Sequence, residues 1–257
     1  MNKVLIFVAS GFSTRMGGFP KGLSMVNDKP VLVNAIDNAR NLYDSIYVIC
    51  NYKTQEHFEK VLAEYNMDNV NIRPIITGKG DAESVLKSIE LVTQEIGNIF
   101  DCTFCWGDAF FISVSPFSKI LQANLNQASS ILVGCSVDND PYAYFDIETV
   151  EGNLDSALIK KSYFKKRDGA VPVGIHDQCI FRCNSKCFME CLALYRKELG
   201  YDGNDYKKSS TNEMGLLNSF TFFCSIGMEA KIVLIPAGQV FSFNTVEELK
   251  AIADGIK

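Results

Sequence analysis

The chain has 257 residues, of which 47% are hydrophobic and 21% charged, and this composition excludes an intrinsically disordered protein. The length suits one large α/β domain with a sizeable buried core. The formal net charge of −5 excludes the basic surface of a general nucleic-acid-binding protein, so any bound phosphate must be held by a few placed cations and backbone amides.

The first half of the chain alternates short apolar runs with segments of helical periodicity. The apolar runs predict buried strands at residues 4–8, 45–50, 70–76, 101–106 and 130–135. The periodic segments predict helices at residues 30–42, 54–65, 81–96 and 116–126, with Thr54 as the N-cap of the second. This alternation predicts an α/β, Rossmann-like fold with a mixed, mainly parallel sheet flanked by helices.

Beyond residue 140 the rhythm changes. We expect extended segments at 142–150 and 157–164, a strand at 175–182, helices at 185–199 and 211–219, a strand at 231–235 and a closing helix at 245–256. We interpret residues 137–230 as a second subregion laid on the first layer. Because no Pro-, Gly- or Ser-rich linker separates it, we predict a single domain over residues 1–257, with a core of residues 1–136 and 231–257.

The compartment is predicted from the apolar run and the cysteines. The run at residues 4–8 is too short for a membrane span and lacks a signal-peptide cleavage site, and no other stretch reaches membrane length. The nine cysteines are an odd number, whereas a secreted protein usually pairs its cysteines. We therefore expect a cytoplasmic protein with reduced thiols and no membrane partner.

The loop after the first strand is the most informative stretch. It reads Ala9-Ser10-Gly11-Phe12-Ser13-Thr14-Arg15-Met16-Gly17-Gly18-Phe19-Pro20-Lys21. Open α/β sheets bind ligands at the carboxyl ends of their strands, and glycines let the backbone approach a ligand closely. With Arg15 and Lys21 as cations, the loop predicts a polyphosphate cradle, although it matches neither the P-loop nor the dinucleotide glycine pattern.

This loop resembles the signature of the sugar-1-phosphate nucleotidyltransferases, cytidylyltransferases and molybdopterin nucleotidyltransferases, Leu-Ala-x-Gly-x-x-Ser/Thr-Arg-Met-Gly followed by Pro-Lys. The resemblance implies the nucleotide-diphospho-sugar transferase (GT-A-like) fold, with 137–230 as the acceptor-binding subregion. It implies that Arg15 grips the β- and γ-phosphates and that Lys21 sits on the α-phosphate as charge builds. The nucleotide would be bound by Ala9, Ser10, Gly11, Phe12, Ser13 and Thr14. Ser10 and Ser13 depart from the commonest pattern, which leaves the branch of the family open.

A second glycine segment, Gly78-Lys79-Gly80-Asp81, follows the third strand and opens a helix. The free amides of a helix N-terminus suit a ligand oxygen. The resemblance implies that these residues lie beside the nucleobase. Because Lys79 replaces the usual Thr, the base is not assigned, and an ordinary glycine turn is the alternative.

Two residues are candidates for a magnesium site. Asp108 follows the fourth strand, where a carboxylate beside a triphosphate is a natural Mg²⁺ ligand. The segment Phe243-Asn244-Thr245-Val246-Glu247-Glu248-Leu249 resembles the closing motif of the family, which implies that Asn244 shares the metal with Asp108. A simple turn at Asp108 and a helix N-cap near Asn244 are the alternatives.

The acceptor side is less distinctive. Asp177 and Gln178, on the strand at 175–182, and Glu213, before a predicted helix, are candidate acceptor-binding residues by the same resemblance. The basic residues within 160–167 are either a solvated loop or an attractor for an acceptor phosphate.

The cysteines and histidines are interpreted as structural. Cys183, Cys187 and Cys191 recur on one helical face and are expected to pack as small hydrophobic residues. Cys102 and Cys105 lie three apart on a strand, so their side chains are expected on opposite faces. Neither His57 nor His176 has an obvious Ser or Cys partner for a nucleophilic triad.

Together these features predict a Mg²⁺-dependent nucleotidyltransferase. Its partners would be a nucleoside triphosphate and a small phosphorylated acceptor, most readily a sugar 1-phosphate with uridylyl transfer, and pyrophosphate would be released. Nucleic acid is not expected as a partner, and a homo-oligomer is left open. The alternatives are a cytidylyltransferase for another phosphorylated alcohol, a glycosyltransferase using Asp138-Asn139-Asp140, and a catalytically inactive nucleotide-binding regulatory protein.

Overall fold

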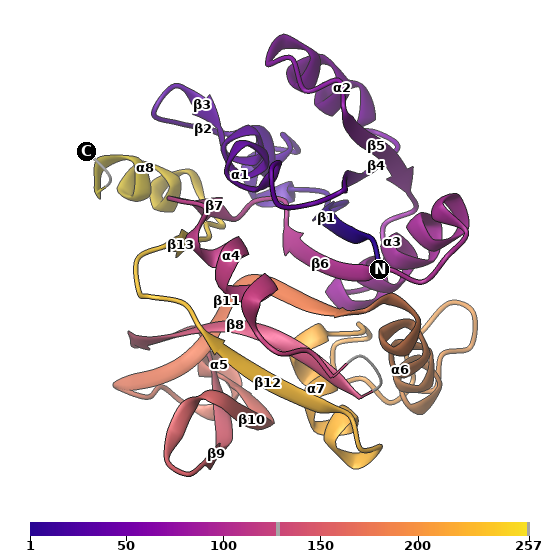
Figure 1. Ribbon diagram of the computed structural model, residues 1–257, viewed down its shortest axis with the longest axis vertical. Helices are drawn as coiled ribbons and strands as arrows, with labels where there is room; N and C mark the ends of the chain where they lie inside the picture. The colour runs from indigo at the N-terminus through magenta and orange to yellow at the C-terminus, as the bar shows by residue number, and fades with distance from the viewer. Residues whose placement is uncertain (127–128, 256–257) are drawn as a thin grey trace.

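A nine-stranded sheet organises the computed structural model, which describes residues 1–126 and 129–255 (Figure 1). Its strand order is β5-β4-β1-β6-β11-β8-β12-β10-β9. The strands are β1 (Lys3–Ala9), β4 (Ser45–Asn51), β5 (Val70–Ile75), β6 (Asp101–Trp106), β8 (Ser130–Asn139), β9 (Ala143–Val150), β10 (Asn153–Phe164), β11 (Val173–Asn184) and β12 (Glu229–Leu234).

The helices and short elements lie between these strands. The helices are α1 (Val31–Ala39), α2 (Gln55–Glu64), α3 (Asp81–Ile96), α4 (Ser115–Gln122), α5 (Lys165–Asp168), α6 (Ser185–Glu198), α7 (Leu216–Ser225) and α8 (Val246–Gly255). Two small sheets pair β2 (Met25–Val26) with β3 (Lys29–Pro30) and β7 (Phe110–Phe111) with β13 (Val240–Phe241). Short 3-10 turns occupy Thr14–Met16 and Lys21–Leu23.

The sheet is mixed, and most of its strands run in one direction. β1 pairs in parallel with β4 and β6, β4 with β5, and β8 with β12. Within the described residues β11 and β10 run against their neighbours, so seven of the nine strands share a direction. The expected mixed, mainly parallel sheet with flanking helices is confirmed.

Residues 137–230 do not form a layer of their own, and the expectation that they lie on a first layer is wrong. Their strand β11 inserts between β6 and β8, with Ile180 opposite Cys105 and Cys183 opposite Ile131. The hairpin of β9 and β10 extends the same sheet beyond β12. In Figure 1 these strands fill the lower half of one continuous sheet. The second half of the chain therefore shares its backbone hydrogen bonds with the first.

Side chains alternate between two hydrophobic clusters, one on each face of the sheet. Along β1, Val4 and Ile6 pack into the cluster that includes α3, α6 and α7, whereas Leu5 and Phe7 pack into the cluster that includes α1, α2 and α4. Cys102 and Cys105 follow the same alternation and lie in opposite clusters, as predicted.

Of the three cysteines expected on one helical face, Cys187 and Cys191 lie on α6, whereas Cys183 lies on β11. Cys183 and Cys191 are buried in the first cluster and Cys187 packs against it, so their predicted role in packing is confirmed. Among residues 1–126 and 129–255, no group of three or more His, Cys, Asp or Glu side chains is arranged to hold a metal ion. The same residues include no helix with the length and apolar character needed to span a bilayer.

Two predictions of local structure need correction. The helix expected from residue 211 begins only at Leu216, because Met214 instead pairs through its backbone with Lys79 (N···O 2.8 Å) and Ala82 (O···N 3.0 Å). Thr54 occupies the predicted N-cap position of α2, but its side chain forms no capping hydrogen bond, because its hydroxyl donates to the carbonyl of Asn51 at 3.2 Å. For the closing helix, residue 256 lies outside the described residues.

Candidate active site

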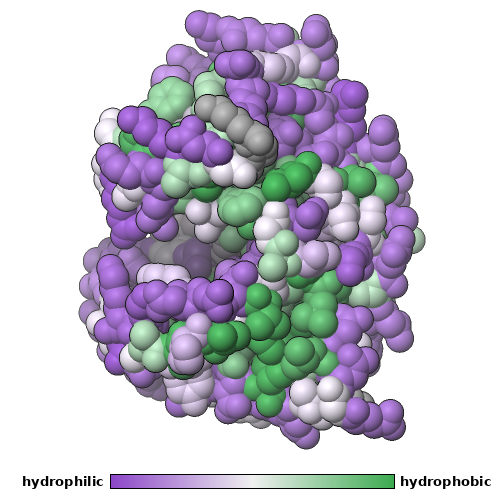
Figure 2. Space-filling view, turned by 90° about the vertical axis from the view of Figure 1, so that its left-hand side faces the viewer, coloured by the Kyte–Doolittle hydropathy of each residue, from purple (hydrophilic) through white to green (hydrophobic). Residues whose placement is uncertain are grey.

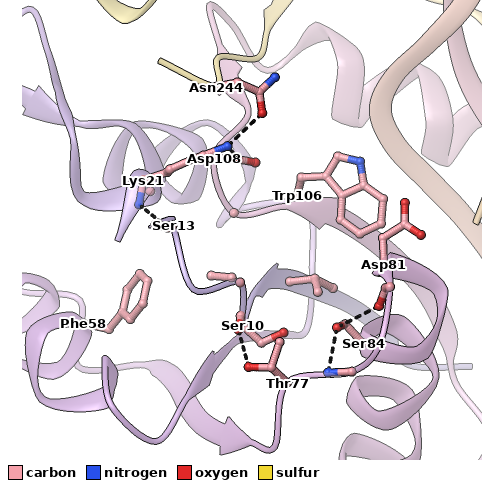
Figure 3. A pocket seen from close by; sticks show the side chains of 17 residues that line it. Ser10, Ser13, Lys21, Phe58, Thr77, Asp81, Ser84, Trp106, Asp108 and Asn244 are labelled. Atoms are coloured by element: carbon pink, nitrogen blue, oxygen red, sulfur yellow. Dashed lines mark hydrogen bonds and ion pairs between the residues drawn. The ribbon is translucent and has the colours of Figure 1, made fainter. Parts of the chain in front are cut away.

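Two adjoining cavities open at the edge where β1 and β6 end. The first, shown in Figure 3, has a volume of about 470 Å³ and is bordered by the loops that follow β1, β5 and β6. The second has a volume of about 1070 Å³ and lies toward β8, β11 and α7. Asp81, Trp106, Asp108 and Asn244 border both cavities, so they mark the junction. This is the edge at which open α/β sheets bind ligands.

The loop after β1 folds back on itself and delivers Lys21 to the junction. Ser13 adopts a left-handed backbone conformation, with φ 49°, and its hydroxyl accepts a hydrogen bond from the Lys21 amide at 3.3 Å. The next residue, Gly22, packs directly against the turn after β6, where an added Cβ would lie 2.3 Å from the carbonyl oxygen of Gly107. Only glycine permits this approach. The loop and the β6 turn therefore place Lys21 beside Asp108.

Lys21 is the centre of a cluster drawn from three distant parts of the chain. Its Nζ donates to Asp108 Oδ2 at 3.2 Å, to the carbonyl of Phe243 at 3.2 Å and to Asn244 Oδ1 at 3.1 Å. Arg15 donates from Nη1 to the same Asn244 oxygen at 3.3 Å. The structure thus brings together the four residues to which the sequence assigned catalytic and metal-binding roles, and Figure 3 shows Lys21 and Asn244 joined above Asp108.

The C-terminal segment is anchored so that Asn244 faces this cluster. The Phe243 ring is 1% exposed and packs with Val26, Val31 and Phe110. The backbone amide of Asn244 donates to the carboxylate of Glu248, which closes the start of α8. Burial of Phe243 on one side and the hydrogen bond to Glu248 on the other therefore fix the position of Asn244.

The donor set around Lys21 suits a magnesium ion. One carboxylate (Asp108), one amide oxygen (Asn244) and one carbonyl (Phe243) already converge on a cationic group, the Lys21 ammonium. Mg²⁺ prefers oxygen ligands and is typically held by one or two carboxylates together with substrate phosphates and water. The residues present therefore fit the metal that the sequence suggested.

The floor of the first cavity carries an unsatisfied hydroxyl. Ser10 is 1% exposed, and its Oγ has no hydrogen-bond partner among the described residues. Its carbonyl is held by the Thr77 hydroxyl at 2.7 Å and by Asn51 Nδ2 at 3.3 Å. A buried polar atom without a partner is costly, and a bound ligand or water would satisfy it. The sequence reasoning missed Asn51, because its partner carbonyls lie forty residues away.

The glycine segment after β5 forms one wall. Gly80, with φ 99°, packs against the backbone of Met214, where an added Cβ would lie 2.4 Å from the carbonyl oxygen. Asp81 Oδ1 accepts hydrogen bonds from the amides of Ala82 at 2.8 Å and Leu216 at 2.7 Å. The Asp81 side chain is exposed to the solvent of the two cavities that it borders. Desolvation, opposed by these hydrogen bonds, raises its pKa to about 6.

Not every residue predicted to bind nucleotide lines a cavity. The first cavity is bordered by Ala9, Ser10, Gly11, Ser13, Gly78, Gly80 and Asp81, but not by Phe12, Thr14 or Lys79. Lys79 turns outward and pairs with Asp205 at 2.8 Å. That contact is the main cause holding the pKa of Asp205 at about 2. The Lys79 ammonium is thus paired with a carboxylate from a distant part of the chain.

The second cavity contains all three candidate acceptor residues, Asp177, Gln178 and Glu213. The first two lie in a bulge of β11, where the pairing with β8 shifts between Asp177 and Phe181 and Cys179 takes φ 57°. Bulges re-aim side chains and are frequent beside active sites. Burial raises the pKa of Asp177, and the charge of His176 opposes this shift.

The sequence reasoning missed a polar network next to these residues. Asp138 Oδ2 lies 2.5 Å from His176 Nε2 and also accepts a hydrogen bond from the Ser136 hydroxyl. Gln178 Nε2 lies 3.2 Å from His176 Nε2. No sequence spacing reveals this contact, because it depends on the register that places His176 opposite Ser136 in the sheet.

The Asp138-Asn139-Asp140 triplet does not form a metal site. Asp138 is committed to Ser136 and His176, whereas Asp140 pairs with Lys165 at 2.5 Å. The two carboxylates are thus held by different partners, which disfavours the glycosyltransferase alternative.

Comparisons with known proteins agree with this geometry. The family model described as the MobA-like NTP transferase domain matches residues 5–197, about three quarters of the chain. No match is found among curated proteins. The inositol-1-phosphate CTP transferase from T. maritima has a similar structure, with 16% identity, a TM-score of 0.67 and coverage of 100% of this chain and 96% of its own.

Two further solved structures are similar. The nucleoside-diphosphate-sugar pyrophosphorylase from Vibrio cholerae RC9 shares 15% identity with a TM-score of 0.71, over 98% of this chain and 99% of its own. A putative glucose-1-phosphate thymidylyltransferase from Bacillus anthracis, solved in complex with a sucrose, shares 16% identity with a TM-score of 0.69, over 100% and 95% of the two chains. At these identities the likeness establishes the fold.

Proposed function

The chain belongs to the MobA-like NTP transferase domain family and is thus a nucleotidyltransferase, and we propose that it couples a nucleoside triphosphate to a sugar 1-phosphate in a Mg²⁺-dependent reaction that releases pyrophosphate. One observation carries the proposal. The Lys21 ammonium, the Asp108 carboxylate and the Asn244 amide oxygen converge where the two cavities meet. A reaction between two bound phosphates needs charge neutralisation at such a junction.

The two cavities have different roles in this proposal. The first binds the nucleotide, with the amides of the loop after β1 and the Ser10 hydroxyl as donors. The second binds the acceptor, with Asp177 and Gln178 on its wall. Residues 1–136 and 231–257 supply most of the nucleotide side, and residues 137–230 supply most of the acceptor side. The reacting phosphates then meet beside Lys21 and Asp108.

The chemistry is an in-line displacement. An oxygen of the acceptor phosphate attacks the α-phosphorus, the new P–O bond forms, and the bond to the bridging oxygen of pyrophosphate breaks with its electron pair. The acceptor phosphate is already ionised near neutral pH, so a strong general base is unnecessary. Lys21 neutralises charge on the α-phosphate and Arg15 orients the departing phosphates. Asp108 and Asn244 would hold Mg²⁺, which supplies Lewis-acid polarisation of the phosphate oxygens.

The acceptor class is supported by the cavity and by the similar proteins. A volume of about 1070 Å³ accommodates a sugar phosphate, and carboxylates and amides on its wall accept and donate hydrogen bonds to hydroxyls. The names of the three similar structures refer to inositol 1-phosphate, glucose 1-phosphate and nucleoside-diphosphate sugars. Cytidylyl transfer to another phosphorylated alcohol is the second candidate, favoured by the similarity to the CTP transferase. Uridylyl transfer to a sugar is the first to test.

The direct test is pyrophosphate release with each of UTP, CTP, GTP, ATP and dTTP, offered a pool of sugar 1-phosphates and phosphorylated alcohols. We expect release with one base, loss of release on chelation of Mg²⁺, and loss in Asp108→Ala. Asp68→Ala, which removes an exposed carboxylate that borders neither cavity, is the matched control and should behave as wild type. Stabilisation by a nucleotide without release from any acceptor in the pool would favour the catalytically inactive regulatory protein.

A further inference from the structure

His176 lies on the wall of the second cavity and has no role in the mechanism described above. Its side chain is 26% exposed, and the cavity is the open space that it borders. Histidine is the side chain whose charge ordinarily changes near neutral pH, and when protonated it donates from both ring nitrogens. A residue of this kind beside a phosphate-binding cavity calls for an explanation.

The imidazole is held from one side by a built network. Nε2 lies 2.5 Å from Asp138 Oδ2, 3.2 Å from Gln178 Nε2 and 3.5 Å from Ser136 Oγ. Ser136 is 1% exposed and Gln178 is 5% exposed, so the network is part of the sheet and not a surface contact. All four residues lie on the paired strands β8 and β11. Such a shell fixes the orientation of the ring.

Asp138 is ionised, as it must be to accept a hydrogen bond from His176 Nε2. Burial acts to raise its pKa, but the hydrogen bonds from Ser136 and His176 and the charge of His176 outweigh burial and hold the pKa below its ordinary value. An ionised Asp138 accepts the proton of Nε2. Nδ1 then remains as the ring nitrogen for a ligand, since no hydrogen bond joins it to any residue in the described part of the chain.

Negatively charged side chains outnumber positively charged ones on the wall of the second cavity. Five carboxylates border it: Asp81, Asp108, Asp138, Asp177 and Glu213. A phosphate entering this space needs a positive donor. Besides His176, the cations on this wall are Lys166 and Arg167, which lie on the four-residue α5 with exposed side chains, and Arg167 is paired with Asp168 at 3.0 Å. His176, in contrast, stands on a central strand beside the bulge that carries Asp177 and Gln178.

We propose that His176 binds the phosphate of the acceptor through Nδ1, and that Asp138 positions the imidazole for this contact. The inference rests on the function proposed above and adds the residue that distinguishes a phosphorylated acceptor from its unphosphorylated form. The ring that binds carries a proton on both nitrogens, so that Nε2 donates to Asp138 and Nδ1 donates to a phosphate oxygen. The charged groups that share this environment are Asp138 on β8, Asp177 on β11, Lys166 and Arg167 on α5, and Glu213 before α7.

The test is steady-state kinetics of His176→Gln with the nucleotide and acceptor identified by the pyrophosphate assay. We expect the KM for the acceptor to rise on the order of tenfold or more, as for loss of a hydrogen bond to a charged group. The KM for the nucleotide should stay within about twofold of wild type. Asp138→Asn should shift the acceptor KM in the same direction by a smaller factor.

His57→Gln is the matched control, because His57 is exposed on α2 and borders neither cavity. An acceptor KM in His176→Gln within about twofold of wild type overturns the inference, and so does an equal rise of both KM values. If His176→Gln does not fold, Asp138→Asn decides between the same outcomes. A wild-type protein that releases no pyrophosphate contradicts the proposed function instead, so the two failures are distinct.

Discussion

Replacing Lys21 with Met tests the centre of the mechanism. Met keeps most of the length of the side chain and removes the ammonium that contacts Asp108, Phe243 and Asn244. If this ammonium neutralises the α-phosphate in the transition state, its loss should cost about 2.7–4 kcal/mol of activation free energy, or about 100- to 1000-fold in kcat. The KM for the nucleotide should change much less, because the loop amides bind the ground state as well.

The structure also limits the effect of this change on folding. The side chains of Lys21 and Asp108 are 16% and 28% exposed, so their ion pair is partly solvated. We expect the free energy of unfolding to fall by less than about 1 kcal/mol. A large loss of turnover without a comparable loss of stability therefore points to chemistry and not to folding.

The assay is pyrophosphate release at saturating nucleotide and acceptor, together with urea denaturation of each variant. Lys119→Met is the matched control, because Lys119 is an exposed lysine of α4 that borders neither cavity. Turnover of Lys21→Met within about fivefold of wild type would refute the assignment of Lys21 to the transition state. Turnover equally low in Lys119→Met would show that the assay reports on something other than the cleft.

Three further predictions concern two residues of the site and one ion pair that borders neither cavity. Ser10→Ala removes a buried hydroxyl without a partner, so thermal denaturation should show the ligand-free protein stabilised by up to about 1 kcal/mol. A nucleotide titration of the same variant should show weaker binding. An unchanged nucleotide affinity would count against a contact between Ser10 and the ligand. The pKa of Asp81 is raised to about 6, so the folded state takes up its proton more readily than the unfolded state, and stability should fall as the pH rises from about 4 to about 6. Asp81→Asn keeps an oxygen that accepts the same hydrogen bonds but does not titrate, so the loss of stability over this pH range should shrink by about 1 kcal/mol. The effect is this small because the carboxyl meets solvent. An unaltered pH profile of denaturation would contradict this prediction. Arg182 pairs with Asp101 at 2.7 Å with side chains 10% and 7% exposed, so Arg182→Met should lower the free energy of unfolding by about 3–5 kcal/mol in urea titrations yet leave the kcat of the folded enzyme unchanged.

The sequence by itself determined the local parts of this protein. The apolar run of β1, the glycine-rich loop after it and the position of Asp108 after β6 were predictable, because strand periodicity and turn chemistry act over a few neighbouring residues. The chain order of strands and helices followed for the same reason. The resemblance of the loop after β1 to a known signature then pointed to Arg15 and Lys21.

Tertiary structure decided which of these parts meet. The convergence of Lys21 with Asn244 joins residues more than two hundred positions apart, and only the completed sheet and the burial of Phe243 bring them together. The insertion of β11 between β6 and β8, which overturned the expected second layer, creates the contact between His176 and Asp138. The ion pair of Lys79 with Asp205 likewise joins residues that are distant in the sequence. Strand register and long-range pairing are set by packing across the whole sheet, and for this reason no local pattern in the chain could have revealed them.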